Sequence, residues 1–184
     1  SILDDLANLD YFYERGIRYI TLAHSKANGI SDSSYDPERK WNGLSDFGKT
    51  VVTRMNELGI MVDISHVSDE AFWQALELSA VPLIASHSSA RHFTPGFERN
   101  MADDMIKALG EKGGVIMINY GSSFLTAEAN GWRGARTTAY EKHLADNNLE
   151  ASDEVQEAFN TAYAASNPYP YADISDVLDH IDHS

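Results

Sequence analysis

Three histidines stand where buried strands are expected to end. The short apolar segments IRYITLAH, MVDISH and VPLIASHS are rich in β-branched residues and end at or next to His24, His66 and His87. In parallel α/β sheets and barrels, active sites collect at the carboxyl ends of the strands. A lone histidine at such a position is more often a hydrogen-bonded structural residue, but three at the same end indicate one shared polar site.

Imidazole is the commonest protein ligand for zinc, and a catalytic zinc ion usually takes three protein ligands plus water. His66 and His87 belong to consecutive strands, so they can share one ion at the strand ends. Two histidines alone are an incomplete site, and a carboxylate is needed in addition. Asp63 lies three residues before His66, which by strand alternation places it on the opposite face and predicts a structural role for it.

Two arginines, Arg91 and Arg99, lie in the loop that follows the third of these segments. A guanidinium group matches a carboxylate in two-point fashion, as the free C-terminus of a peptide requires. On sequence alone, a surface position or an ordinary salt bridge is the more frequent role for either arginine.

The remaining four histidines carry weaker signals. His92 follows a strand-end loop and could line the pocket, whereas His143 is expected in an exposed polar helix. His180 and His183 have the i, i+3 spacing that can chelate a metal on a helix, but a solvated helix face is the favoured interpretation.

The apolar periodicity predicts alternating helices and strands. Ser68 is expected to cap one helix, and Asn100 another with Asp103 at the reciprocal position. The predicted order is helix 2–15, strand 17–24, loop 25–43, helix 47–59, strand 61–66, helix after Ser68, strand 81–88, helix 100–109 and strand 115–120.

Near-continuous apolar strands between amphipathic helices predict a parallel α/β sheet buried on both faces, either an open doubly wound sheet or a closed barrel. No Gly-x-Gly-x-x-Gly or P-loop follows a strand, which disfavours a nucleotide-binding fold. Residues 126–171 are predicted to be a helical excursion within one domain spanning 1–184, with helices over 137–148 and 152–165. Ile174, Val177, Leu178 and Ile181 then share one face of a last helix.

The composition is that of an ordinary globular protein, with 184 residues, 43% hydrophobic and 23% charged. A net charge of −14 argues against a nucleic-acid partner. The absence of cysteine rules out disulfides and thiolate zinc sites. No apolar run is long enough to span a membrane and no signal peptide is present, so a periplasmic or a cytoplasmic location stays open.

Several stretches together resemble the renal (membrane) dipeptidase family of zinc metallopeptidases, known as M19. They are GIRYITLAH, GLSDFGKTVVTRMNELGIMVDISHVS, PLIASHSSAR, ERNMADDMI, VIMINYGSSF and VLDHIDH. The resemblance covers nearly the whole chain except the excursion, and the combination of ISHVS with SHSSAR is the most specific part. It implies a partial (β/α)8 barrel of the TIM type and a binuclear zinc site that hydrolyses dipeptides through a metal-activated bridging hydroxide.

By motif position, the resemblance implies a role for five residues of this chain. His66 and His87 would be ligands of one zinc ion, and His24 would stabilise the tetrahedral intermediate at the scissile carbonyl. Arg99 would bind the C-terminal carboxylate of the substrate, and Phe124 would form part of the pocket wall.

The chain departs from the family pattern in what it lacks. The family's His-x-Asp pair, its bridging glutamate and its late-strand aspartate have no counterpart here, so the chain resembles a central fragment. A complete site holds two zinc ions, and this chain retains at most one partial site. Losing a single oxyanion contact typically costs about 100- to 1,000-fold in rate, so the isolated chain is expected to be inactive.

Two alternatives to the metallodipeptidase stay open. Another metal-dependent amidohydrolase on the same barrel, for N-acyl amino acids or lactones, would share the histidines but not depend on Arg99. A non-catalytic binding module would keep the fold and lose the metals. The expected partner is a small dipeptide substrate, with a homodimer as an open option and no nucleic acid or membrane segment.

Overall fold

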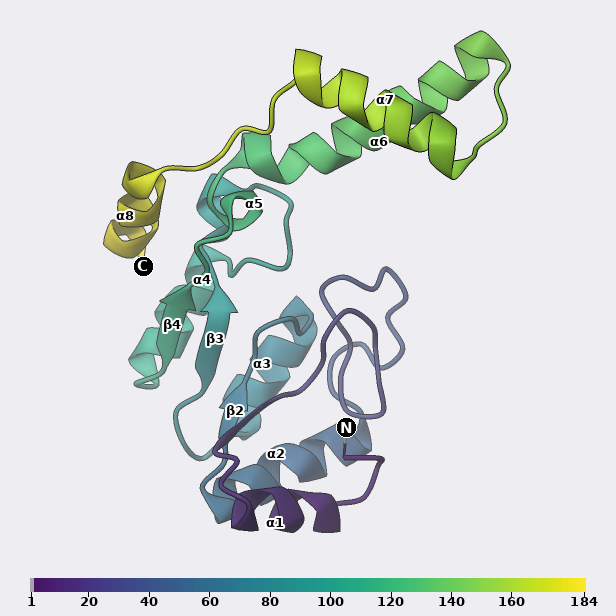
Figure 1. The fold of residues 1–184 in the computed structure, drawn as a ribbon. Coiled ribbons are helices and arrows are strands. Elements are labelled where there is room, and N and C mark those ends of the chain that lie inside the picture. The colour runs from purple at the N-terminus through teal and green to yellow at the C-terminus, as the bar shows by residue number, and fades with distance from the viewer. Residues whose placement is uncertain (1) are drawn as a thin grey trace.

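A parallel four-stranded sheet organises the chain, as a computed structural model describing residues 2–184 shows (Figure 1). The strands are β1 (Tyr19–Thr21), β2 (Met61–Asp63), β3 (Ile84–Ser88) and β4 (Val115–Ile118). They are hydrogen-bonded in the order β1-β2-β3-β4, and every pair is parallel. A doubly wound sheet reverses its strand order at a switch point, whereas a barrel adds each strand beside the previous one. The order confirms the partial (β/α)8 barrel.

Helices connect and follow these strands. The N-terminal half contains α1 (Ala7–Glu14), α2 (Asp46–Leu58), α3 (Asp69–Leu78), the short 3₁₀ helix η1 (Arg91–Phe93) and α4 (Asp103–Glu111). After β4 come α5 (Ser122–Leu125), α6 (Ala127–Asn147), α7 (Asp153–Ser166) and α8 (Ile174–His183). No helix within residues 2–184 has both the length and the apolar character that a membrane crossing requires.

Local capping explains where most of these helices begin and end. The hydroxyl groups of Ser45 and Ser68 accept hydrogen bonds from the backbone at the starts of α2 and α3, and Gly59 ends α2 with a φ of 77°. The prediction for Asn100 was wrong. Helix α4 begins after Ala102 without a side-chain cap, because the Asn100 side chain is buried and bonds elsewhere.

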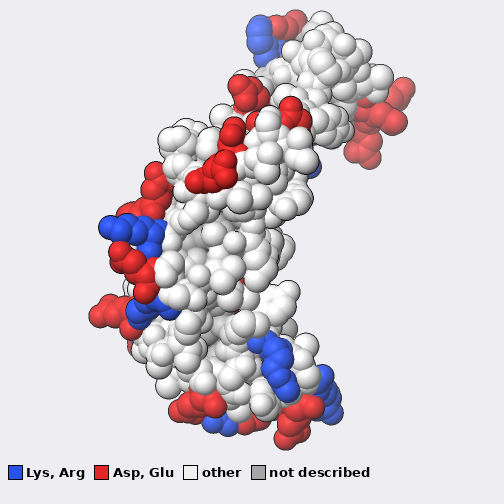
Figure 2. Space-filling view, turned by 90° about the vertical axis from the view of Figure 1, so that its left-hand side faces the viewer, with Lys and Arg blue, Asp and Glu red and all other residues white. Residues whose placement is uncertain are grey.

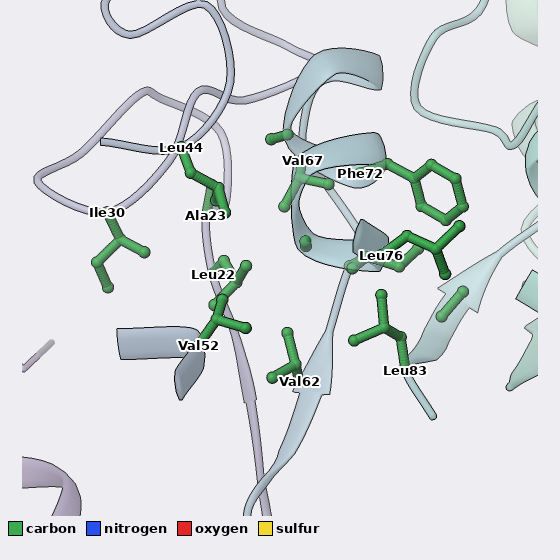
Figure 3. Packing of buried hydrophobic residues seen from close by; sticks show 14 of the residues in the cluster. Leu22, Ala23, Ile30, Leu44, Val52, Val62, Val67, Phe72, Leu76 and Leu83 are labelled. Carbon is green, nitrogen blue, oxygen red and sulfur yellow. The ribbon is translucent and has the colours of Figure 1, made fainter. Parts of the chain in front are cut away.

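The hydrophobic core lies between the sheet and helices α2 and α3 (Figure 3). Val62 of β2 and Leu83, just before β3, are fully buried, and so are Val52 of α2 and Phe72 of α3. At about 25 cal/mol per Å² of buried apolar surface, each such side chain stabilises the fold by about 1.5–3 kcal/mol. This core fixes the positions of the strand ends, where the candidate residues lie.

Strand β4 departs from the expectation of burial on both faces. Its side chains alternate in exposure, and Val115 and Met117 are 52% and 46% exposed. Of the apolar residues predicted to share one face of α8, Ile174, Leu178 and Ile181 are exposed, with Leu178 at 51%, whereas Val177 is half-buried. The face of the molecule that carries β4 and α8 is largely free of charged side chains at its middle (Figure 2).

The predicted helical excursion is present, but its first helix is longer than expected. Helix α6 begins at Ala127, about ten residues before the predicted start, because Thr126 caps it by accepting from Ala129 N. Helix α7 packs against α6 through ring contacts such as Tyr140 with Phe159. The pair extends away from the sheet beyond the carboxyl ends of β3 and β4 (Figure 1). Its status as an insertion within a single domain remains a prediction.

Candidate metal and substrate site at the strand ends

His66 and His87 come together after the carboxyl end of β2 and within β3. Their Nε2 atoms lie 2.8 Å apart, and their rings are 4.8 Å apart between centroids. The structure thus brings together the two histidines that the sequence proposed as ligands of one ion.

The backbone of His66 adopts an unusual conformation. Its φ is 72°, in the left-handed region that costs a non-glycine residue about 1–3 kcal/mol. The Ser34 amide and hydroxyl both donate to the His66 carbonyl, at 2.8 and 3.1 Å, and so hold this turn in place. The turn directs the imidazole toward β3 instead of continuing the strand.

A hydrogen-bonded chain behind His87 fixes which of its nitrogens is free. The Ser86 hydroxyl lies 2.7 Å from His87 Nδ1 and donates to Asp63 Oδ2 at 2.5 Å. Because that hydroxyl proton is committed to the carboxylate, His87 Nδ1–H donates to Ser86 Oγ and leaves the Nε2 lone pair free. Asp63 also accepts from Thr21 Oγ1 and from the Ser65 amide. The expected structural role of Asp63 is thus to orient His87 through the Ser86 hydroxyl.

Burial keeps both imidazoles neutral. Burial, together with the nearby Arg99 charge, lowers the pKa of His66 to about 3 and lowers the pKa of His87. His66 Nδ1 is buried without a hydrogen-bond partner. Neutral imidazoles are the form that binds a metal ion, so the pair is ready to act as ligands at neutral pH.

His24 lies against the histidine pair from the neighbouring strand. Its ring stacks on His66 with centroids 4.3 Å apart and planes 27° apart, and it is exposed on its other side. The Ser25 hydroxyl lies 2.8 Å from His24 Nδ1. A hydroxyl that donates to Nδ1 leaves the proton on Nε2, where it can be donated to a substrate oxygen. Tyr35 packs on the other edge of His66 at 5.7 Å.

Arg99 is a charged side chain beside this group, and it is almost entirely buried, at 3% exposure. Its Nη1 donates to Ser88 Oγ at 2.8 Å and its Nη2 to the His87 carbonyl at 2.7 Å, while its Nε is buried without a partner. Burial lowers the pKa of Arg99, and no carboxylate within residues 2–184 forms an ion pair with it. The Phe124 ring covers its guanidinium at 5.3 Å.

Arg91, the other arginine of the loop, has a structural role. Its guanidinium makes a two-point contact with Asp69 at 2.6 and 2.7 Å and also donates to the Asn100 carbonyl. This pairing ties the loop to the first turn of α3. The structure thereby separates the two candidates, since Arg91 already has a carboxylate partner and Arg99 has none among the described residues.

One histidine has a role that the sequence analysis assigned wrongly. His180 is completely buried, not solvated, because its Nδ1 accepts from Ala90 N at 3.0 Å and its Nε2 donates to the Leu125 carbonyl at 3.0 Å. The signal was available in its spacing, since His180 follows Val177 by three residues on the same helix. Sequence reasoning also missed Ser86 and Tyr35, which touch the site only through tertiary contacts.

The donor set at the strand ends fits a metal such as zinc. Donor atoms on one tetrahedral zinc ion lie about 3.3 Å apart, so a small rotation of His66 and His87 accommodates it between their Nε2 atoms. The set is incomplete within residues 2–184, because neither histidine belongs to a group of three or more possible metal ligands there. Further ligands are therefore required for a complete site.

Comparisons with known proteins place the chain in a family and a fold. A family model described as membrane dipeptidase (peptidase family M19) matches residues 1–184. The dipeptidase tcpJ of Claviceps purpurea is 42% identical over 112 residues, which cover 61% of this chain and 26% of that protein. The solved structure of the probable dipeptidase PvdM from Pseudomonas aeruginosa has a TM-score of 0.78 and 25% identity, covering 99% of this chain and 50% of that one.

A second solved structure has a bound ligand. The metallo peptidase from Rhodobacter sphaeroides, liganded with a phosphinate mimic of the dipeptide L-Ala-D-Ala, has a TM-score of 0.62 and 24% identity, covering 95% of this chain and 55% of that one. The chain thus spans about half the length of these solved chains, and its alignment with tcpJ spans about a quarter of that protein.

Proposed function

Because this chain belongs to the membrane dipeptidase family, peptidase family M19, we propose that its full-length protein is a zinc-dependent enzyme that hydrolyses the peptide bond of dipeptides. The observation that carries this proposal is the pairing of two convergent imidazoles, His66 and His87, with a buried arginine that has no anionic partner. One group suits a metal ion and the other suits a free carboxylate.

In this proposal, His66 and His87 hold zinc through Nε2. Zinc, when bound, supplies the Lewis acidity that makes water nucleophilic at neutral pH. The chain from Asp63 through Ser86 to His87 Nδ1 keeps the His87 lone pair directed at the ion. Ligands beyond these two histidines complete the site in the full-length protein, so we expect the 184-residue chain alone to be inactive.

Arg99 receives the C-terminal carboxylate of the dipeptide. A buried guanidinium without a counterion has lost hydration without regaining an ion pair, so an entering carboxylate binds it strongly. Its Nη atoms already bond Ser88 and the His87 carbonyl, which fixes the guanidinium plane. Phe124 covers one face of that plane and excludes water from the contact.

His24 acts on the other end of the scissile bond. Its exposed Nε2–H donates to the carbonyl oxygen, which gains negative charge as water attacks. Stacking on His66 holds the ring beside the ligand pair, so the carbonyl and the metal ligands lie in one place. Because Arg99 binds the C-terminal carboxylate and the histidines lie at the scissile carbonyl, the fixed spacing between them favours substrates of dipeptide length.

The test is hydrolysis of a dipeptide panel by the full-length protein loaded with zinc, with a chelator control. We expect Arg99→Gln to lower kcat/KM for free dipeptides by about 100- to 1,000-fold, because a buried charge pair is lost. The matched substrate is the same dipeptide with an amidated C-terminus. For this poor substrate the variant should equal the unaltered protein, since no carboxylate is present.

Other outcomes separate the alternatives. Zinc-dependent hydrolysis of an N-acyl amino acid or a lactone that is unaffected by Arg99→Gln would favour another amidohydrolase. Stoichiometric zinc binding without any hydrolysis in the panel would also contradict the dipeptidase assignment. A full-length protein that binds no zinc at the strand-end histidines would leave the non-catalytic module.

A further inference from the structure

A second cluster of metal-binding side chains lies apart from the strand-end histidines. It consists of His92 of η1, Asp103 at the start of α4 and His183 at the end of α8. One ligand atom from each lies within 4.8 Å of the others, and none of the three belongs to the site described above. We propose that these three residues bind a transition-metal ion, with zinc as the best-matched ion.

The cluster is held together by its own contacts. His183 Nε2 and Asp103 Oδ1 are 2.9 Å apart, and the rings of His92 and His183 stack at 4.5 Å with planes 27° apart. Phe93 lies 5.4 Å from the His183 ring and supports it from the side. Segments far apart in the sequence thus bring one ligand atom each within 4.8 Å of the others.

Helix α8 is positioned by a separate anchor. The buried His180 bonds both Ala90 N and the Leu125 carbonyl, and its ring lies 4.4 Å from Phe93. His183 follows one turn later on the same face, so the anchor at His180 directs it toward His92. The cluster therefore does not depend on a freely moving terminus, because the preceding turn of α8 is fixed in the core.

The ligand chemistry selects the class of ion. Two imidazoles and one carboxylate are a common zinc donor set, whereas calcium and magnesium prefer oxygen ligands alone. Donor atoms on one zinc ion lie about 3.3 Å apart and the ligand atoms of the cluster lie within 4.8 Å of one another, so the widest pair must close by at most about 1.5 Å. The exposed side chains of His92 and Asp103 are free to make that movement. Water completes the fourth position at the surface.

A bound ion would link η1, α4 and α8. The loop between Ala90 and Asn100 carries both His92 and Arg99, so the ion would fix one end of the loop that holds the carboxylate-binding arginine. The role of the ion would be structural, because the cluster shares no residue with the strand-end site.

The experiment counts zinc in the full-length protein after metal removal, reloading and gel filtration, with any polyhistidine tag cleaved. We expect His92→Gln and His183→Gln each to bind one zinc ion fewer per chain than the unaltered protein. The control is His143→Gln, which removes a partly exposed histidine of α6 outside the cluster and should leave the count unchanged. This difference in count does not depend on whether the protein hydrolyses dipeptides.

A crystal of the zinc-loaded protein supplies a second measurement that needs no variant. Anomalous scattering at the zinc edge should give a peak about 2.0–2.2 Å from the ligand atoms of His92, Asp103 and His183. Asp103→Asn, which keeps an oxygen but loses the charge, should weaken binding at this position by about tenfold or more. Equal zinc counts in all proteins, or no peak at the cluster, would show that it is only a histidine–aspartate hydrogen bond and would overturn the proposal.

Discussion

Arg91 and Arg99 lie in the same loop and have the same side chain, yet their surroundings give them different roles. Arg91 is neutralised by Asp69, so its contribution is to hold the loop on α3. Arg99 is buried without a carboxylate and retains an unpartnered Nε. A buried charged group without an ion-pair partner lowers the stability of the fold. A ligand that supplies the opposite charge restores that stability. Burial, combined with the absence of a counterion among residues 2–184, is the observation on which the proposed binding role of Arg99 rests.

The first prediction concerns Ser86, whose hydroxyl connects Asp63 to His87 Nδ1. We expect Ser86→Ala to lower zinc affinity at the strand-end site by about 10- to 100-fold, since residues behind a ligand have effects of this size. The measurement is competition with a chromophoric chelator, using the full-length protein.

The control for this prediction is Ser79→Ala. Ser79 is buried, whereas Ser86 is half-buried, and the Ser79 hydroxyl also donates, to Asn56 Oδ1 and the Val81 carbonyl, but it lies outside the site. This variant should keep the zinc affinity of the unaltered protein. Equal affinities in the Ser86 and Ser79 variants would show that the Asp63–Ser86 chain does not orient His87.

At the scale of elements, close packing and buried hydrogen bonds decide where each helix can lie. Helix α2 approaches the loop of residues 25–43 so closely that Gly48 faces the Ile30 carbonyl, where a side chain has no room. Helix α8 depends on His180, because most of its apolar residues face solvent. Neither contact can be deduced from helix periodicity, since each involves a partner distant in the sequence.

The second prediction compares two helical glycines. A Cβ at position 48 would lie 2.1 Å from the Ile30 carbonyl oxygen, so we expect Gly48→Ala to lower the free energy of unfolding by about 1–3 kcal/mol. Gly131 of α6 has nothing within 4 Å of such a Cβ, so Gly131→Ala should raise the free energy of unfolding by about 0.5–1 kcal/mol. Denaturant unfolding of the full-length variants gives both values. Changes of the same sign would contradict the packing of α2 on the loop.

The third prediction concerns the pH dependence that His180 introduces. Burial lowers the pKa of His180 below its ordinary value of 6.5, although the bond to the Leu125 carbonyl partly opposes this. The unfolded chain therefore binds a proton at a higher pH than the folded chain does. The contribution of neutral His180 to the free energy of unfolding is fully present above pH 6.5. It declines as the pH falls from 6.5 toward the pKa of His180 in the folded chain.

Thermal unfolding at several pH values tests this effect. We expect His180→Gln to show a smaller loss of stability between pH 7 and pH 5 than the unaltered protein, because its side chain does not titrate. At pH 7, His180→Ala should cost about 2–4 kcal/mol through a cavity and two unmet hydrogen bonds. His143→Gln, on α6, should not reduce the pH dependence. Parallel pH profiles for His180→Gln and the unaltered protein would refute the role of His180.

On the scale of the whole molecule, the sheet is an arc of a barrel with one long apolar face. The edge strand β4 exposes Val115 and Met117, and α8 exposes Ile174, Leu178 and Ile181. The same face has few charges at its middle, while acidic and basic side chains gather around its rim (Figure 2). Unpaired strand edges and contiguous apolar surface favour association with another β-strand or helix. In the full-length protein we expect further barrel elements to cover this face.

The fourth prediction belongs to that scale. The isolated 184-residue chain should show no zinc-dependent hydrolysis of dipeptides that its full-length protein cleaves, because within residues 2–184 the strand ends provide only His66 and His87 to the ion. It should also aggregate more readily than the full-length protein, as static light scattering would measure. Turnover by the soluble isolated chain, abolished by chelator, would show that these residues suffice.

Sequence by itself determined the alternation of strands and helices and the position of three histidines at strand ends, while the choice of a barrel over an open doubly wound sheet came from the family resemblance. Those features depend on local periodicity, on capping residues such as Ser68 and on motif spacing, all of which act within about a dozen residues. The family followed from the same motifs. The Asn100 cap failed because its buried side chain instead bonds Ser89 N, 11 residues earlier, and the Phe124 carbonyl, 24 residues later.

Only the tertiary structure decided which polar residues are buried, which are paired and which are left without a partner. The 2.8 Å approach of His66 to His87, the isolation of Arg99 and the anchoring of α8 by His180 all join segments separated by many residues. Burial and electrostatic pairing depend on the summed packing of every element, so no local pattern encodes them. The same holds for His92, Asp103 and His183, which meet only because α8 packs against η1 and α4.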